Sequence, residues 1–123
     1  MTNKDIQLII NNGGATLDKN GAEVSFKNGY QVSIRDCFIL NVDNIEQIID
    51  SINAVLLNLK RGEYCGLWVN GEKIYIDVSV RILDRKKAFY IGRNFKQIAI
   101  FEWATGKCPA CALKIKKSKM ARA

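Results

Sequence analysis

Hydrophobic residues along this chain fall into stretches of helical and strand-like spacing, in the order helix, two strands, helix, two strands, helix, strand. The most regular stretch runs from about Asp43 to Lys60, where apolar residues recur every three or four positions, as on one face of a helix. Asp43 is predicted to cap its start, and Gly62 suits its end. Because one apolar stripe must be covered, we expect this helix to lie on a sheet. The stripe consists of Ile45, Ile48, Ile49, Ile52, Val55, Leu56 and Leu59.

Two shorter helices are predicted elsewhere. The stretch from Asn3 to Asn12 has isoleucines at helical spacing and stops at a pair of glycines. A second stretch begins at an Asp84 cap and runs to about Arg93. Asn94 is predicted to end that helix in a left-handed conformation.

Alternation of apolar and polar residues predicts two β-hairpins. The first spans Ala22 to Arg35 and turns at Lys27-Asn28-Gly29, with Gly29 left-handed. The second spans Tyr64 to Ile82 and turns in two residues at Asn70-Gly71. One face of this second hairpin is apolar, and the other holds Trp68, Lys73, Tyr75, Asp77, Ser79 and Arg81.

A last strand is predicted from Lys96 to Trp103, with a turn after it at Thr105-Gly106-Lys107. These elements make an α+β fold with an antiparallel sheet of about five to six strands, packed by two or three helices. We expect one domain over residues 1–112 and a basic C-terminal tail or edge strand over residues 113–123.

Composition fits a single globular domain, since 48% of the 123 residues are hydrophobic and 25% are charged. The formal charge of +7 comes from 19 Lys and Arg against 12 Asp and Glu, but five of the cations lie in the last ten residues. Without those five, 14 basic residues face 12 acidic ones. The high net charge therefore describes the tail, and we expect no general affinity for nucleic acid.

The chain has no histidine. Histidine is the usual general base near neutral pH and the commonest metal ligand, so the sequence disfavours an enzyme and predicts neither a metal nor a cofactor. No signal peptide or membrane-spanning run is recognisable, so we expect a cytoplasmic protein that does not engage membranes.

Cys108 and Cys111 form one C-x-x-C pair. Ordinary thiols, a zinc site and a redox pair remain open interpretations, and ordinary thiols are favoured. A zinc ribbon needs a second such pair, whereas Cys37 and Cys65 are isolated.

Two groups of residues could bind a ligand. Trp68 and Tyr75 come together on the polar face of the second hairpin, where they suit a flat nucleobase or a partner protein unless a helix covers them. The stretch Arg93-Asn94-Phe95-Lys96-Gln97 follows the end of the third helix and suits a phosphorylated nucleotide, although a solvated turn is the simpler interpretation.

The stretches Gly66 to Ser79 and Gln97 to Trp103, with Asp84 to Ala88 and Gly92 between them, resemble small proteins of phages and prophages. Tyr30 to Ile34 fits the same pattern, and the likeness covers roughly Tyr30 to Gly106. In size and element order the chain is most similar to the first type of Thoeris anti-defence protein, a family that sequesters immune signalling nucleotides.

That resemblance implies an antiparallel sheet flanked by helices, assembled as a dimer or a higher homo-oligomer such as a hexamer. It implies binding of cyclic ADP-ribose isomers without cleavage in the host bacterial cytoplasm, with separate sites for cyclic di- or trinucleotides between subunits. The residues it suggests for the first site are Phe89 or Phe95, Asn94, Arg81, Arg85 and Arg93. The turn of Thr105, Gly106 and Lys107 is its candidate for a second site.

Two rival functions remain open. One is a protein-interaction module or inhibitor that uses the Trp68 and Tyr75 face. The other is a nucleic-acid binder that works through the basic tail.

Overall fold

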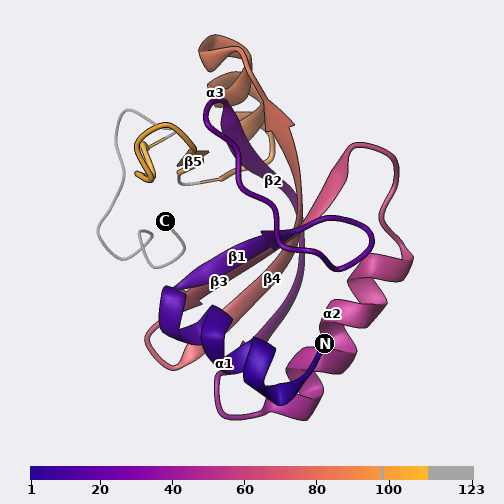
Figure 1. The fold of residues 1–123 in the computed structure, drawn as a ribbon. Helices are drawn as coiled ribbons and strands as arrows, with labels where there is room; N and C mark the ends of the chain where they lie inside the picture. The colour runs from indigo at the N-terminus through magenta and orange to yellow at the C-terminus, as the bar shows by residue number, and fades with distance from the viewer. Residues whose placement is uncertain (98, 111–123) are drawn as a thin grey trace.

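A five-stranded antiparallel sheet, curled and accompanied by three helices, makes up the fold (Figure 1). The structure is a computed structural model that describes residues 1–97 and 99–110. Its elements are α1 (Asn3–Asn12), β1 (Gly14–Leu17), β2 (Tyr30–Asn41), α2 (Ile45–Leu57), β3 (Glu63–Asn70), β4 (Lys73–Ile82), α3 (Arg85–Asn94) and β5 (Phe101–Glu102). The strands lie side by side in the order β1-β3-β4-β2-β5. The predicted α+β class with an antiparallel sheet and helices is confirmed.

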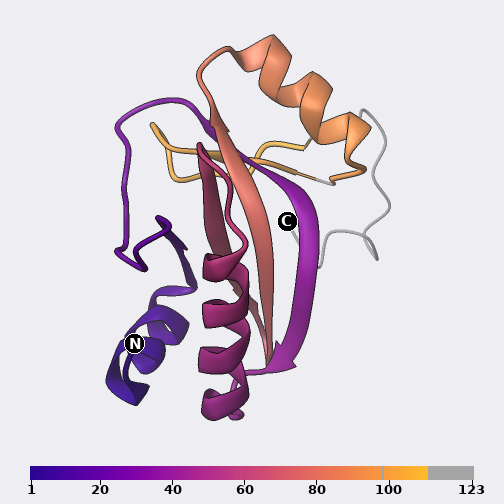
Figure 2. The same cartoon turned by 90° about the vertical axis from the view of Figure 1, so that its right-hand side faces the viewer.

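All three helices pack against the apolar face of the sheet, where the core lies (Figure 2). Ile48 and Ile52 of α2 are fully buried against Ile74 and Ile76 of β4. Ala88 of α3 packs in a second cluster farther along the same face, with Tyr30, Val32, Val80 and Ile82. The face of the sheet that points away from the core is therefore left for polar residues.

The helix ends match the predictions in part. Asp84 caps α3 by accepting a hydrogen bond of 2.8 Å from the backbone N–H of Lys87, as predicted. The predicted left-handed residue is wrong, because α3 ends through Phe95 and Lys96 adopts the positive φ of 57°.

The boundaries of α2 also differ from those predicted. This helix starts at Ile45 after Asn44, so Asp43 is not its cap, and it ends at Leu57 rather than near Lys60. A turn explains the late start, since the backbone N–H of Asn44 donates to the carbonyl oxygen of Asn41 at 3.2 Å.

The predicted hairpin over Ala22 to Arg35 is wrong. Residues 22–29 form a connection that touches β1 through one bridge, between Leu17 and Glu23. β1 pairs instead with β3, and β2 pairs with β4 along ten residue positions that include two register shifts. Phe26 packs its ring edge-on against Tyr64 and Trp103. Pairing between strands far apart in sequence thus replaces the local hairpin.

The second hairpin is confirmed, but its two-residue turn is Gly71-Glu72 instead of Asn70-Gly71. The register moves by two residues, so every side chain keeps its predicted face and Trp68 lies directly opposite Tyr75.

The last predicted strand is shorter than expected, because β5 contains Phe101 and Glu102. The turn at Thr105 and Gly106 is present, and Lys107 pairs back with Glu102. The predicted tail or edge strand over residues 113–123 lies outside the described residues, as does Cys111. None of the described helices is long and apolar enough to cross a bilayer.

Candidate functional site

The polar face of the sheet is built by strand alternation. Cross-strand pairing sets Gly66 opposite Asp77, Trp68 opposite Tyr75 and Ser33 opposite Ser79. Successive side chains of a strand point to opposite faces, so these six residues share the face that the helices leave uncovered. The helix that could have covered Trp68 and Tyr75 is absent from the described part of this face.

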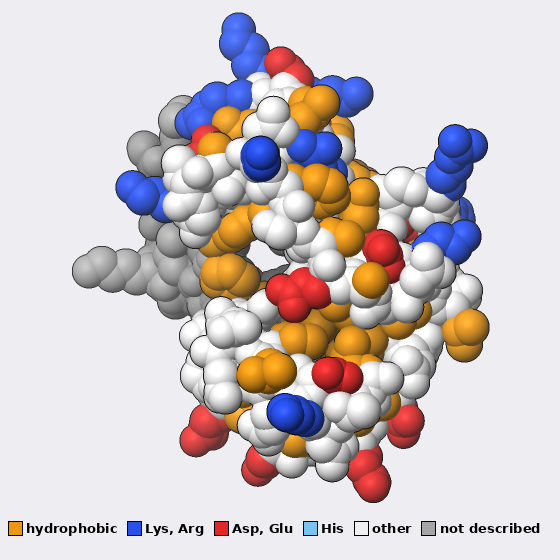
Figure 3. Space-filling view, viewed as in Figure 1, with side chains coloured by type: hydrophobic (Ala, Val, Ile, Leu, Met, Phe, Trp, Pro, Cys, Tyr) orange, Lys and Arg blue, Asp and Glu red, His pale blue; other side chains and the backbone are white. Residues whose placement is uncertain are grey.

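A cavity of about 300 Å³ opens on this face. Its floor is the sheet, and its walls come from the end of α1, from β1, from residues 23–25, and from Gln97, residues 99–101, Trp103 and Cys108. The space-filling view shows a hollow near the middle of the molecule, between β1 and β5 (Figure 3). The polar and aromatic residues of its lining include Glu23, Gln31, Ser33, Trp68, Asp77, Ser79 and Trp103.

A chain of hydrogen bonds crosses the floor of the cavity. The indole N–H of Trp103 donates to Oε1 of Gln31 at 3.1 Å, and Nε2 of Gln31 donates to Oγ of Ser79 at 2.9 Å. Gln31 and Ser79 are both buried. Because these bonds use both ends of the Gln31 amide, its orientation is fixed, and so is the position of the Trp103 ring.

Ser33 sits beside this chain. Its hydroxyl oxygen is buried and has no hydrogen-bond partner within the described part of the protein. An unsatisfied buried hydroxyl costs about 1–3 kcal/mol. Since Ser33 also lines the cavity, a ligand that reaches the floor has a polar group there to pair with.

Asp77 brings a carboxylate to the same floor and is 8% exposed. Gly66 lies opposite it in β3, and a Cβ at Gly66 would collide with Oδ1 of Asp77. Glycine at this position is therefore what lets the carboxylate lie across the neighbouring strand. Glu23 is in the wall, so the described lining contains two acidic residues and no Lys or Arg.

The predicted cationic residues lie outside this lining. Arg81 donates to the backbone oxygen and Oδ1 of Asn28, at 2.9 and 2.6 Å, and its guanidinium stacks 4.2 Å from the centre of the Phe26 ring. Arg85 stacks 4.8 Å from the centre of the Phe89 ring. These contacts hold each guanidinium against the protein itself.

The other predicted ligand residues are spread over the molecule. Trp68 lines the cavity, and Tyr75 is its cross-strand neighbour. Phe89 is half-buried and packs edge-on against Tyr30, so it belongs to the second core cluster. Arg93, Asn94 and Phe95 are exposed at the end of α3, where Phe95 leaves 49% of its surface accessible. The structure therefore unites Trp68 and Tyr75 and separates them from the group on α3.

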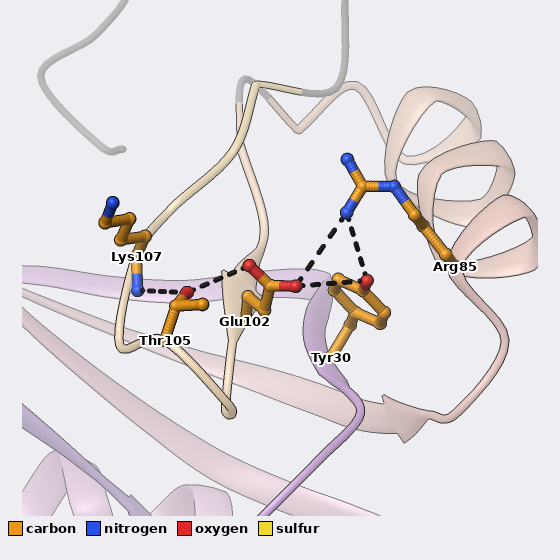
Figure 4. A network of polar contacts seen from close by, with 5 residues as sticks. All are labelled: Tyr30, Arg85, Glu102, Thr105 and Lys107. Carbon is orange, nitrogen blue, oxygen red and sulfur yellow. Dashed lines mark hydrogen bonds and ion pairs between the residues drawn. The ribbon is translucent and has the colours of Figure 1, made fainter.

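The predicted second site belongs to a polar network around Glu102 (Figure 4). One carboxylate oxygen accepts a hydrogen bond from the Thr105 hydroxyl at 2.9 Å. The other accepts one from the Tyr30 hydroxyl at 3.2 Å and lies 3.8 Å from the Arg85 guanidinium. The backbone N–H of Lys107 in turn donates to the Thr105 hydroxyl at 3.2 Å.

This network ties β5 to β2 and α3. Phe101 and Trp103 flank Glu102 and line the cavity, so the network holds one wall of the cavity in place. β5 pairs with β2 through only two residue pairs, Tyr30 with Glu102 and Gln31 with Phe101. Side-chain contacts must therefore supply much of the attachment of this wall.

Glu102→Ala tests that role. Loss of the carboxylate leaves the Tyr30 and Thr105 hydroxyls without their acceptor, so we expect the unfolding free energy to fall by about 1–2 kcal/mol. Backbone amides of residues 100–107 should exchange with deuterium faster than in the unchanged protein. Glu72→Ala, at the exposed β3–β4 turn, is the matched control and should stay within about 0.5 kcal/mol. Equal exchange in both variants would contradict the role of Glu102.

Cys108 lies in the wall of the cavity and is half-buried. Burial raises the pKa of the Cys108 thiol above its ordinary value, which favours an ordinary thiol over a redox nucleophile. The described residues contain no group of three or more His, Cys, Asp or Glu side chains able to hold a metal ion. Whether Cys108 acts with Cys111 lies outside the described residues.

Gln31, Ser33 and Trp103 were not among the residues predicted to form a site. For Gln31 and Ser33 the sequence holds a weak signal. Polar residues occupy alternate positions there, as they do at Asp77 and Ser79, which is typical of one polar face of a strand. Comparison with protein families, with curated proteins and with solved structures finds no match to this chain.

Proposed function

We propose that this protein is a binding protein that sequesters a signalling nucleotide without cleaving it and holds the base of that nucleotide in the cavity. The observation that carries the proposal is a pre-formed cavity with two tryptophans, Trp68 and Trp103, in its lining and hydrogen-bonding groups on its floor. Aromatic side chains with a few fixed polar groups are the usual features of a small-molecule site. Tryptophan faces also provide stacking surfaces for nucleobases.

Size and charge indicate how such a ligand would lie. A volume of about 300 Å³ is at the lower end of the range of roughly 300–1,000 Å³ for ligand pockets, so the cavity suits a base or nucleoside. Glu23 and Asp77 repel phosphate from the interior. The phosphates of the nucleotide would remain at the mouth, in contact with water.

The resemblance to Thoeris anti-defence proteins supplies the class of ligand. On that basis the ligands to test are cyclic ADP-ribose isomers and cyclic dinucleotides, and the proposed protein is a homo-oligomer in the host bacterial cytoplasm. Tyr90 on α3 and Phe95 directly after it leave 61% and 49% of their surfaces accessible, and this apolar area supports self-association.

Calorimetry with cyclic ADP-ribose isomers, cyclic di-GMP and cyclic di-AMP tests the proposal. We expect saturable binding of at least one of them at micromolar concentration or below, and recovery of that ligand intact by mass spectrometry. Leu57→Ala serves as a control and should bind the ligand as tightly as the unchanged protein, because Leu57 is 87% exposed at the end of α2, on the helical side of the sheet. No binding heat up to high micromolar concentration, or recovery of a cleaved product, would exclude a sequestering function.

A protein-interaction function has one specific observation in its favour. Trp68, Tyr75 and Ile39 form a cross-strand row, and Ile39 leaves 59% of its surface accessible. An apolar row at a sheet face suits a partner protein. Under this alternative, Ile39→Asp would abolish binding of the partner, whereas it should leave nucleotide binding in the cavity unchanged.

A further inference from the structure

We propose that the cavity selects a base that presents two adjacent N–H donors, as guanine does, and that Asp77 accepts both. This inference rests on the proposed function, because it names the base that the same cavity would hold. Among the ligands proposed above, it favours cyclic di-GMP over cyclic di-AMP and over the cyclic ADP-ribose isomers, which carry adenine. Guanine offers N1–H and the exocyclic N2–H₂ side by side, with the O6 acceptor next to them. Adenine offers one exocyclic amine beside the N1 lone pair.

The first argument is the charge of the cavity. Its described lining includes the carboxylates of Asp77 and Glu23 and no basic side chain. Hydrogen bonds from N–H groups to a carboxylate that is 8% exposed are strong, because little water competes for its oxygens. The cavity therefore favours ligands rich in N–H groups.

The second argument is that the amide on the floor is already engaged. Recognition of adenine by an amide needs a donor and an acceptor side by side, as in Asn or Gln. Both ends of the Gln31 amide are bonded, one to Trp103 and the other to Ser79. An adenine that used Gln31 would have to share the amide with Trp103 and Ser79, in an orientation that those two bonds already fix.

Asp77 can accept further hydrogen bonds and lies where a base in the cavity can reach it. An ionised carboxylate has about four acceptor positions, so it can keep its contacts within the protein and still accept two hydrogen bonds from a ligand. Gly66 leaves the space over which Oδ1 lies. The buried hydroxyl of Ser33 lacks a partner within the described residues. Ser33 lies opposite Ser79, which is two positions from Asp77 along β4. Its O–H can donate to O6 of the same base.

The hydrogen-bonding edge of adenine does not match these groups. Its N1 lone pair would face a carboxylate oxygen, so one favourable contact is replaced by a repulsive one. A site built around hydrogen bonds to one edge discriminates strongly against an isostere that cannot make them. We therefore expect a large preference for guanine over adenine.

A nucleoside series on the unchanged protein tests the inference. Guanosine should bind at least 10-fold more tightly than inosine, which keeps N1–H but lacks the N2 amine, since a hydrogen bond to a charged group is worth about that factor. Adenosine should bind more weakly still. Cyclic di-GMP and cyclic di-AMP should follow the same order. Guanidinium chloride at millimolar concentration tests whether an N–H edge alone suffices.

Asp77→Asn tests the residue. The asparagine keeps the shape but offers one donor and one acceptor, so guanosine affinity should fall at least 10-fold and the ratio of guanosine to adenosine affinity should fall with it. Asp50→Asn is the matched control, because Asp50 is an exposed carboxylate on α2 and does not line the cavity. Circular dichroism should show that both variants are folded. The nucleoside series remains decisive if Asp77→Asn does not fold.

The outcomes separate this inference from the proposed function. If adenine compounds bind as tightly as guanine compounds, the guanine preference is wrong and the proposed function stands. If guanidinium binds as tightly as guanosine, the role of the aromatic base is wrong. If no nucleotide or nucleoside binds, both proposals fail.

Discussion

Trp68→Ala is expected to weaken nucleotide binding by about 5-fold to 150-fold. Stacking of a base on an aromatic side chain contributes about 1–3 kcal/mol by alanine substitution, and 1.4 kcal/mol corresponds to a tenfold change in affinity. Trp68 lines the cavity from β3 and lies opposite Tyr75 in β4. Removal of the indole opens this side of the cavity to water and removes a stacking surface.

Trp68→Phe supplies the comparison, because it keeps an aromatic face and should retain most of the affinity. Titration calorimetry of both variants with the best ligand measures the effect, and their melting temperatures show whether the fold is kept. Should Trp68→Ala be folded and bind as tightly as the unchanged protein, the base does not lie in this cavity.

A rise in pH from 9 to 12 is expected to destabilise the protein through Cys65. Burial raises the pKa of this thiol from 9.0 to about 12, and the nearby charge of Asp77 acts in the same direction. Below pH 9 the thiol is protonated in both the folded and the unfolded chain, and its full contribution to stability is present. Above pH 9 the unfolded chain loses the proton first, so the unfolding free energy falls until the folded thiol ionises near pH 12.

The size of this effect follows from the two pKa values. A change from 9.0 to about 12 corresponds to roughly 4 kcal/mol, at about 1.4 kcal/mol for each pH unit. Lysines and tyrosines also titrate in this window, so Cys65→Ala is the control. Urea unfolding at several pH values should give a steeper decline for the unchanged protein than for Cys65→Ala. Parallel declines would show that the buried thiol does not contribute.

Local patterns in the sequence were sufficient for the helices and for one hairpin. The apolar stripe of Ile48 and Ile52 describes a helix whatever it packs against, and the alternation in β3 and β4 fixes both faces even though the turn moved by one residue. Helix ends were less predictable, because a turn between Asn41 and Asn44 delays α2 past Asp43. The position of a helix end therefore depends on the conformation of the residues that precede the helix.

The prediction of the first hairpin failed for a different reason. Val24 and Phe26 alternate as in a strand, but β2 pairs with β4, whose paired residues lie 32 to 52 positions away in sequence, and β1 pairs with β3. The sequence alone does not say which of several strand-like segments pair. The apolar ring of Phe26 packs against Tyr64 and Trp103 and not against a residue of a neighbouring hairpin strand.

The candidate site shows the same limit. Trp68 and Asp77 share a face within one hairpin, so local alternation was enough to group them. Gln31 and Trp103 complete the cavity through a hydrogen bond between residues 72 positions apart, which no local pattern reveals. Arg81 and Arg85 have suitable chemistry for a phosphate but make contacts with Asn28, Tyr30 and Glu102 that only the fold creates.

The two tryptophans allow the most direct test of the central claim. The sequence holds two of them, Trp68 and Trp103, and both line the cavity, so a ¹⁵N correlation spectrum contains two indole N–H signals that Trp68→Phe assigns. Titration with cyclic di-GMP should shift both indole signals together with the backbone amides of Ser33 and Asp77. Saturable binding that leaves both indole signals in place and shifts amides of α3 instead would contradict a base-binding cavity on the polar face of the sheet.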